Sequence, residues 1–300
     1  MKKKILITGA YGFLGRELAL KLKKNSIVYG IGNSSENISF NHKNSFRKLI
    51  KKKVTTNILL KNFKNIDFIV HCAGRVIGLE PELDYKKNVD TTIEMLNYIK
   101  KLKKKPSVIF LSTIAVYKTI NGKKINENFK INPTSHYAFN KKMSEDLLKF
   151  YSKKYKFNLL IARTTSLFGK DLQRQFIFDA CKKLSNNNNN FFGTGNEVRD
   201  WLHVSDMCNL ISKFIQKKFQ GINIINCGSG TGYKIKDVIY ILKNLFNNKL
   251  EVKFNSVSDT NPSIMVANIS AAKKFGWTPK MQFKDGLINY VKWYKKKFKI

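Results

Sequence analysis

Acidic residues are scarce in this chain: its 300 residues include 20 Asp and Glu against 56 Lys and Arg, a formal net charge of +36. Such an excess would ordinarily suggest a nucleic-acid or anionic membrane partner. The lysines are spread along the whole chain, however, and few arginines and no nucleic-acid-binding motif accompany them. Asparagine is also abundant, with a run at 186–190. The charge therefore indicates a compositional bias, predicts no nucleic-acid or membrane partner, and would still attract a doubly anionic small substrate.

Cysteine and long apolar runs are also scarce. The four cysteines lie far apart and include no C-x-x-C pair, which favours reduced structural thiols and gives no metal site. No apolar run approaches the roughly 20 residues that span a bilayer, and the longest, at 108–116, fits a buried strand. The opening MKKKILI resembles the charged start of a signal peptide, but Thr8 and Gly9 interrupt its apolar stretch. We therefore expect a soluble, cytoplasmic protein that binds no metal.

Strand and helix patterns alternate from the start of the chain, and 43% of the residues are hydrophobic, enough for a sizeable core. Expected strands lie at 4–8, 27–31, 68–71, 108–112, 159–163 and 222–227, and expected helices at 13–22, 89–102 and 143–155. The alternation predicts an α/β fold, a Rossmann-type, doubly wound parallel sheet with a smaller, discontinuous substrate-binding lobe. The dinucleotide-binding domain would comprise 1–165 plus about 200–230, and the substrate lobe about 166–199 and 231–300.

Three glycines, each separated from the next by two residues, follow the first expected strand in ILITGAYGFLG (5–15). A strand that turns sharply into a helix here would leave the first helical N–H groups unpaired, which suits a pyrophosphate. Gly9 would allow the tight turn, Gly12 the close approach of the phosphate, and Gly15 the packing of helix on strand. The alternative is a glycine-rich turn that binds nothing. The segment resembles the TGxxGxxG loop of extended short-chain dehydrogenases. Candidate cofactor contacts are Gly9, Tyr11, Gly12, Phe13, Leu14 and Gly15.

The second expected strand decides the cofactor prediction. An NAD enzyme of this kind carries an acid there for the ribose 2′-hydroxyl, whereas this chain has Gly32, Asn33 and Ser34. These residues leave room and donors for a 2′-phosphate, so NADP is the expected cofactor; NAD stays open if Asn33 only forms a turn. After the strand at 68–71, the HCAG segment ends in small residues, and its Ala73 would let the backbone cover the cofactor.

Thr113 follows the strand expected at 108–112, and Tyr137 and Lys141 come next in HYAFNK. Four residues apart on a helix, Tyr137 and Lys141 share one face, so the ammonium can lie beside the phenol. A free tyrosine has a pKa of about 10, and half-ionisation near neutral pH needs about 4 kcal/mol. A neighbouring lysine and an oxidised nicotinamide could supply this energy through opposite charge. The Y-x-x-x-K pair alone is weak evidence, because many amphipathic helices carry one by chance.

Four segments stand in the order and spacing of the extended short-chain dehydrogenase/reductase family: TGAYGFLG, HCAG, LSTIAVY and YAFNK. The chain resembles the NAD(P)-dependent nucleotide-sugar epimerases, dehydratases and reductases of that family. The resemblance implies that Tyr137 is the acid/base, that Lys141 is its electrostatic partner and binds the nicotinamide ribose, and that Thr113 holds the substrate oxygen. Members that dehydrate sugars carry an acid directly after the Thr. Ile114 and Ala115 follow here, so a 4,6-dehydratase is disfavoured.

The resemblance extends into the second lobe, where it implies contacts with a sugar diphosphate. Ser166, in ARTTSLFG, stands where the family often has an Asn that makes such a contact. Arg199, in RDWLHVSD, matches a family Arg that binds the diphosphate, although a structural pair with Asp200 is the alternative. An upstream Arg that often binds the second phosphate is absent, since 259–262 read DTNP. The chemistry is therefore better supported than the identity of the substrate.

Three functions are consistent with these expectations. The first is an NADPH-dependent reductase of a 4-keto (deoxy)sugar nucleotide, which the absence of an acid after the second strand favours. The second uses the same residues for NAD-dependent 4-epimerisation of a nucleotide sugar. The third is a nucleotide-binding protein without catalysis. The resemblance also implies a homodimer built on the helix of Tyr137 and the helix near Asn88, and a role in surface polysaccharide biosynthesis.

Overall fold

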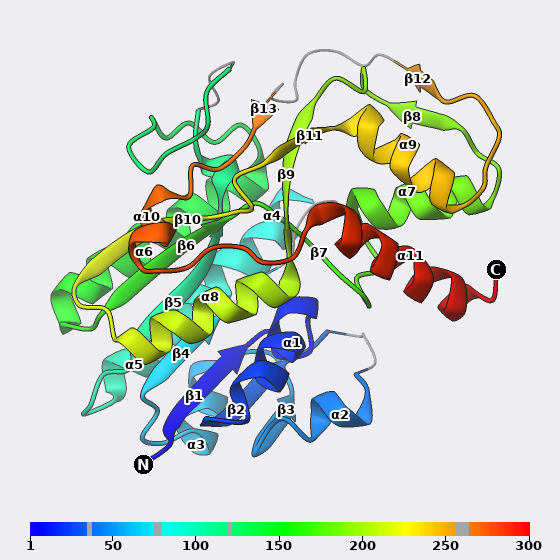
Figure 1. Ribbon diagram of the computed structural model, residues 1–300. Coiled ribbons are helices and arrows are strands. Elements are labelled where there is room, and N and C mark those ends of the chain that lie inside the picture. The colour runs from blue at the N-terminus through cyan, green and yellow to red at the C-terminus, as the bar shows by residue number, and fades with distance from the viewer. Residues whose placement is uncertain (35–37, 75–79, 119–121, 256–263) are drawn as a thin grey trace. The chain divides into compact units, whose positions relative to one another are not determined.

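The computed structural model describes residues 1–34, 38–74, 80–118, 122–255 and 264–300 (Figure 1). The DTNP segment at 259–262 lies outside the described residues. The chain divides into two compact units. Unit 1 comprises Met1–Lys118, Lys130–Thr164 and Cys208–Ile225, and unit 2 comprises Thr119–Phe129, Thr165–Met207 and Asn226–Ile300. No helix of the described residues is both long and apolar enough to cross a membrane.

One segment of unit 2 interrupts unit 1 in the sequence. Residues 122–129 lie with unit 2, although the chain on either side of that segment belongs to unit 1. Backbone bonds hold them there: Ile125 N–H donates to Val266 O (2.8 Å), and Asn268 N–H donates to Ile125 O (2.8 Å). The assignment of one unit to the cofactor and the other to the substrate stays a prediction.

A seven-stranded sheet forms the centre of unit 1, in the strand order β10-β6-β5-β4-β1-β2-β3 (Figure 1). Its strands are β1 (Lys3–Thr8), β2 (Ser26–Gly32), β3 (Lys48–Lys51), β4 (Phe68–His71), β5 (Ser107–Thr113), β6 (Leu159–Thr164) and β10 (Ile222–Cys227). Neighbours from β6 to β3 pair in parallel, which confirms the Rossmann-type sheet. The strand β3 was not expected, because its sequence KLIK has lysine at both ends and too few apolar residues for a clear pattern.

The helices of unit 1 connect these strands. They are α1 (Phe13–Leu22), α2 (Phe40–Lys43), α3 (Thr56–Asn62), α4 (Pro81–Tyr85), α5 (Thr91–Lys101), α6 (His136–Tyr155) and the part of α8 (Val204–Lys217) from Cys208 on. A π-helical turn, η1 (Lys86–Asp90), joins α4 to α5, and a short 3-10 turn, η2 (Ile114–Val116), follows β5. The helix α6 begins before the expected position 143, because the Ser135 hydroxyl accepts a bond from Ala138 N–H (3.2 Å) and caps it. Tyr137 and Lys141 therefore lie on one continuous helix.

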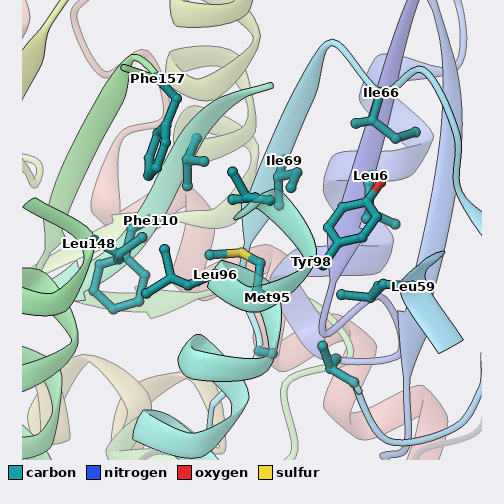
Figure 2. Packing of buried hydrophobic residues seen from close by; sticks show 14 of the residues in the cluster. Leu6, Leu59, Ile66, Ile69, Met95, Leu96, Tyr98, Phe110, Leu148 and Phe157 are labelled. Carbon is teal, nitrogen blue, oxygen red and sulfur yellow. The ribbon is translucent and has the colours of Figure 1, made fainter. Parts of the chain in front are cut away.

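The core on one face of this sheet lies against α3, α5 and α6 (Figure 2). Figure 2 shows side chains of β1, β4 and β5 beside those of α5 and α6; among those labelled are Leu6, Ile69, Phe110, Met95, Leu96 and Leu148. Each fully buried side chain of this size contributes about 1.5–3 kcal/mol. The buried Tyr98 hydroxyl donates to Phe63 O (2.8 Å), so its polar atom is satisfied. This packing holds α6 against the strand that ends at Thr113.

Unit 2 is built around β9 (Val198–His203). The strands β7 (Ser166–Phe168), β11 (Gly232–Lys234) and β13 (Ile264–Met265) pair with β9, and β8 (Asn190–Phe192) pairs with β12 (Lys253–Asn255). Its helices include α7 (Gln175–Ser185), α9 (Ile235–Leu245), α10 (Ser270–Lys274) and α11 (Phe283–Phe298). The buried Asp200 carboxylate accepts bonds from the N–H groups of Ser229 (2.8 Å), Gly230 (3.0 Å) and Ala267 (3.2 Å). Asp200 thus joins β9 to two loops of unit 2.

Candidate active site

The strands β1 and β4 end where the strand order of the sheet reverses. From β1 the chain adds β2 and β3 on one side, and then β4, β5 and β6 on the other. Such a reversal opens a ligand crevice at the carboxyl ends of the strands. Here Cys72 N–H donates to Thr8 O (3.1 Å), and a Cβ on Gly9 (φ +73°) would lie 2.8 Å from Ala73 N. The structure therefore brings Gly9 and Ala73 side by side, with no space for a side chain at position 9.

The N-terminus of α1 fits a pyrophosphate. Gly12 is its N-cap residue, no side chain caps it, and no acid lies in its first turn. Its first N–H groups and the positive end of the helix dipole are thus suited to an anion. A Cβ on Gly15 would lie 2.4 Å from Gly9 O, so only glycine lets the helix approach the loop this closely. Of the other candidate contacts in the loop, Tyr11 and Phe13 are buried and Leu14 is half-buried.

The residues described at the end of β2, up to position 34, include no carboxylate. Gly32 closes the strand, and a Cβ there would lie 3.3 Å from Ala10 N in the glycine loop. Asn33 is exposed and Ser34 is half-buried directly after it. An amide and a hydroxyl can bond either a ribose 2′-hydroxyl or a 2′-phosphate, so these two side chains do not distinguish NAD from NADP.

Lys141 is buried where α6 packs against β5. Its residue is 5% exposed, and its Nζ donates to Leu111 O (2.8 Å) and lies 4.7 Å from the centre of the Phe110 ring. Burial lowers the pKa of Lys141 to about 8, although nearby acidic groups oppose the shift. The amine therefore changes its charge close to neutral pH, as groups in active sites often do.

Thr113 and Tyr137 lie on the two elements that Lys141 joins. Tyr137 is half-buried one turn before Lys141 on α6. Thr113 ends β5, and its Oγ1 accepts a bond from Ala115 N–H (3.2 Å). Among the described residues no group accepts the Thr113 hydroxyl proton, so the hydroxyl can donate it to a substrate oxygen. The helix with Tyr137 and Lys141 and the strand with Thr113 are thus brought together.

A buried ion pair anchors the same helix, and our sequence analysis missed it. Glu145 lies one turn after Lys141 and accepts bonds from Arg163 Nε (2.9 Å) and Nη2 (2.6 Å), with both side chains at most 2% exposed. Although burial opposes it, the bonded Glu145 carboxylate raises the pKa of Arg163. Ser112 Oγ also donates to Glu145 Oε1 (2.6 Å). The pair thereby ties α6 to both β5 and β6; the K-x-x-x-E spacing, which puts Glu145 on the face of Lys141, was the available signal.

Asp84 is a second buried acid near this helix, and our sequence analysis missed it as well. It lies on α4, is 3% exposed, and accepts bonds from Asn88 Nδ2 (2.8 Å) and Asn140 Nδ2 (2.7 Å). Asn140 directly precedes Lys141 on α6. No sequence pattern pairs an acid of one helix with an amide more than fifty positions later, so only the fold reveals the contact.

His71 and Cys72, at the end of β4, are neutral groups. His71 Nδ1 lies 2.6 Å from Thr8 Oγ1 and its Nε2 lies 3.1 Å from Thr92 Oγ1. Burial lowers the pKa of His71 to about 3 and raises that of Cys72 to about 12. Both residues therefore fit a structural role. Among the described residues, no three His, Cys, Asp or Glu side chains are grouped so that they could hold a metal ion.

Ser166 and Arg199, the candidate substrate contacts, lie in one small sheet of unit 2. In the parallel pairing of β7 with β9, exposed Ser166 stands opposite Trp201, two positions after Arg199. Arg199 is half-buried opposite Tyr233 of β11, and burial lowers the pKa of its guanidinium. A guanidinium fork on this sheet can bind a phosphate bidentately. The neighbouring Asp200 bonds loop N–H groups of unit 2 instead.

The sequence matches the model of the NAD dependent epimerase/dehydratase family over residues 5–228. The chain belongs to this family. It is therefore an NAD(P)-dependent enzyme of the extended short-chain dehydrogenase/reductase type, as the four motifs predicted.

Proteins similar to this chain cover 85% or more of it. "Uncharacterized UDP-glucose epimerase YtcB" of Bacillus subtilis is 26% identical, over 96% of each chain. GDP-6-deoxy-D-talose 4-dehydrogenase of Aggregatibacter actinomycetemcomitans is 25% identical, over 85% of this chain and 84% of its own. The crystal structure of UDP-glucuronic acid 4-epimerase from Bacillus cereus, in complex with UDP-glucuronic acid and NAD, superposes with a TM-score of 0.87 at 24% identity, covering 98% of this chain and 99% of its own.

Proposed function

We propose that this chain is a 4-epimerase of a nucleotide-activated sugar that retains a bound NAD. The observation that carries the proposal is the seating of α6 on β5, where Lys141 Nζ bonds Leu111 O two residues before Thr113. Epimerases among the similar proteins support this function. Epimerisation was the alternative in our sequence analysis, and the comparisons favour it over the reductase that we expected first.

The residues of unit 1 would hold and move one proton at the sugar O4 atom. A bound nicotinamide supplies hydride transfer at C4. Tyr137 takes the 4-hydroxyl proton in the first half of the reaction and returns it in the second. Thr113 donates a hydrogen bond to the same oxygen, and the positive charge of Lys141 stabilises the phenolate of Tyr137. Because the sugar presents its other face before the second half, C4 ends with inverted configuration.

Backbone and side chains at the ends of β1, β2 and β4 would hold the cofactor. The pyrophosphate would lie on the N–H groups between Gly12 and Gly15, where α1 begins without a capping side chain. The adenosine ribose would contact Asn33 and Ser34, and Ala73 would cover the dinucleotide. The amide of Asn33 suits the ribose 2′-hydroxyl of NAD. The crystal structure of the Bacillus cereus epimerase contains NAD. NADP, the cofactor that we expected from the sequence, fits the same residues. Identifying the nucleotide that the purified protein retains distinguishes NADP from NAD.

The substrate would be a nucleoside diphosphate sugar. Arg199 carries the fork that a diphosphate requires, and Ser166 lies on the strand paired with β9. The net charge of +36 would attract such an anion to the protein. Thr113 would contact the sugar itself.

Cofactor analysis tests this function first. The purified protein is gently denatured and the released nucleotide is identified by mass spectrometry. Separate samples receive UDP-glucose, UDP-N-acetylglucosamine or UDP-glucuronic acid without added nicotinamide, and proton NMR follows C4 inversion. Near-stoichiometric NAD with inversion of one sugar is the expected result. A protein without retained cofactor that turns over no sugar nucleotide in this assay would contradict the proposal.

Reduction of a 4-keto sugar nucleotide is the second candidate. Two observations favour it: the end of β2 lacks an acid, and one relative is named a 4-dehydrogenase. A reductase would release its dinucleotide after each turnover and would consume added NADPH. Selective binding of NADPH, with consumption only when a 4-keto sugar nucleotide is supplied, would establish it in place of the epimerase.

The remaining expectations stay predictions. Phe139 and Phe150 are 55% and 59% exposed on α6, and large apolar side chains on this helix support the expected homodimer. The cytoplasmic location and the role in surface polysaccharide biosynthesis rest on the sequence alone.

A further inference from the structure

Two buried acids are connected to the part of α6 that carries Lys141, and they differ in how their charge is neutralised. Glu145, on α6 itself, is bonded by both nitrogens of the Arg163 fork, so its negative charge is paired. Asp84, on α4, is 3% exposed and accepts its side-chain bonds from the amides of Asn88 and Asn140. Amides donate hydrogen bonds without a compensating positive charge. No Lys, Arg or His of the described residues forms an ion pair with Asp84.

Among the described residues, two other titratable groups facing Lys141 are neutral near neutral pH, and a third is charged but paired. From the end of β4 come His71, whose pKa burial lowers to about 3, and Cys72, whose pKa burial raises to about 12. The Cys72 thiol would favour the ammonium only as a thiolate, a form it does not adopt near neutral pH. From β6 comes Arg163, which is paired with Glu145. Among the described residues, Asp84 is therefore the acid that adds negative charge without an ion-pair partner beside Lys141.

We infer that Asp84 is the counter-charge of Lys141, a positioning residue that keeps the buried ammonium protonated beside Tyr137. Two kinds of contact hold it in place. The Asn140 bond links it to the residue before Lys141, and the Asn88 bond anchors it one turn further along its own segment. As part of the acid/base machinery, this role rests on the proposed function, but the charge of Lys141 can be measured without any sugar.

The consequence of losing Asp84 has a definite sign. Burial already lowers the pKa of Lys141 to about 8, while Asp84 opposes the shift. Removal of the carboxylate would lower the pKa further, so the ammonium would lose its proton at a lower pH. A neutral Lys141 no longer stabilises the phenolate of Tyr137. Turnover would therefore fall on the alkaline side of the pH profile and survive on the acidic side.

Lysine NMR measures this charge directly. The protein is labelled with lysine carrying carbon-13 at the ε position, and the signal missing from Lys141→Met identifies Lys141. We expect its titration near pH 8 in the unchanged protein and about 1 pH unit lower in Asp84→Asn. The control is Glu82→Gln, which removes an exposed carboxylate from the same helix and should leave the titration unchanged. An unshifted titration in Asp84→Asn overturns the inference.

A charge swap separates the carboxylate from the fold. In Asp84→Asn/Asn140→Asp the same bond connects the two positions in the opposite direction, so the buried charge moves to α6 but stays beside Lys141. The titration should return to within about 0.5 pH unit of the unchanged protein. If Asp84→Asn does not fold, Asp84→Ser/Asn140→Ser removes both members of the pair without leaving an amide against an amide. A titration at the original pH in that variant, or a failure of the swap to restore it, overturns the inference.

The pH dependence of turnover tests whether the charge of Lys141 matters for catalysis. With the sugar nucleotide that the enzyme inverts, kcat of Asp84→Asn should fall about fivefold at pH 8 and recover to within about twofold at pH 6, with KM unchanged. A loss that is equal at both pH values would mean a structural role only and would overturn the inference. If no sugar nucleotide is inverted by the unchanged protein, the proposed function fails, while the NMR titrations still decide the role of Asp84.

Discussion

The two units differ in what defines their candidate sites. In unit 1, the backbone defines the part of the site predicted for the cofactor: Gly9 and Gly15 have no space for a Cβ, and the N-terminus of α1 has no side-chain cap. In unit 2, two side chains on paired strands, Ser166 and Arg199, define it. Backbone requirements allow few residue types, whereas a side-chain contact can be replaced by another residue with similar chemistry. The comparison teaches that a sequence motif can identify the chemistry of such an enzyme before it identifies the substrate.

Replacing Tyr137 tests the chemistry assigned to unit 1, and we expect the largest effect on turnover from this change. Tyr137→Phe removes the group that takes and returns the proton, so kcat should fall about 10²- to 10⁴-fold. The retained cofactor should stay near its normal amount, because the glycine loop is unchanged. Tyr151→Phe, on the same helix, is the matched control and should keep full turnover. Turnover within tenfold of normal in Tyr137→Phe would remove this residue from the mechanism.

Breaking the buried ion pair between Glu145 and Arg163, which anchors α6, should have the next largest effect, a loss of stability. Glu145→Gln leaves the buried Arg163 guanidinium without its carboxylate and should cost about 3–5 kcal/mol of unfolding free energy, measured by urea denaturation. Asp146→Asn removes an exposed partner of Lys142 and should cost at most about 1 kcal/mol.

An apolar replacement of the whole pair refines this prediction. Glu145→Leu/Arg163→Met buries no unpaired charge, so it should recover most of the stability lost in Glu145→Gln. A double variant that is no more stable than Glu145→Gln would show that the charges themselves, rather than the burial of one without the other, hold α6 in place.

The backbone requirement of unit 1 can be tested at two glycines with similar conformations. A Cβ added to Gly9 (φ +73°) would lie 2.8 Å from backbone atoms, whereas one added to Gly221 (φ +65°) would have nothing within 4 Å. Gly221→Ala should therefore cost only the strain of a positive φ, about 1–2 kcal/mol. Gly9→Ala should cost a further 1–3 kcal/mol or so, because neighbouring backbone must shift, and should reduce the retained cofactor. Equal losses of stability would mean that the close contact at Gly9 is unimportant.

Much of unit 1 was predictable because its signals are local. The apolar runs of β1, β4, β5 and β6 and the stripe of α1 follow directly from the order of residues. The strand β3 was missed because it is short and bounded by lysines. The apolar pattern predicted α6 only from 143, and the helical spacing of Tyr137 and Lys141 was the signal for its first turns, because these depend on the Ser135 cap rather than on apolar periodicity.

The polar contacts around Lys141 were predictable only in part. The Tyr137 and Lys141 pair has a fixed helical spacing, so the sequence suffices to place it on one face. Asp84 and Asn140, however, meet through a contact between distant segments, and Arg163 meets Glu145 across β6 and α6. Such tertiary contacts have no sequence period, so they emerge only when the sheet brings the segments together.

Replacing Arg199 tests the substrate contacts assigned to unit 2, and we expect the smallest effect from this change. Arg199→Met keeps much of the side-chain volume but removes the fork, so KM for the sugar nucleotide should rise about tenfold with kcat nearly unchanged. Lys234→Met, which removes an exposed charge from the neighbouring strand β11, controls for the general attraction of the positive surface. Retained cofactor should be normal in both variants, because neither changes unit 1. If Lys234→Met raises KM as much as Arg199→Met does, the diphosphate is attracted by overall charge alone, and side-chain identity on β9 does not select the substrate.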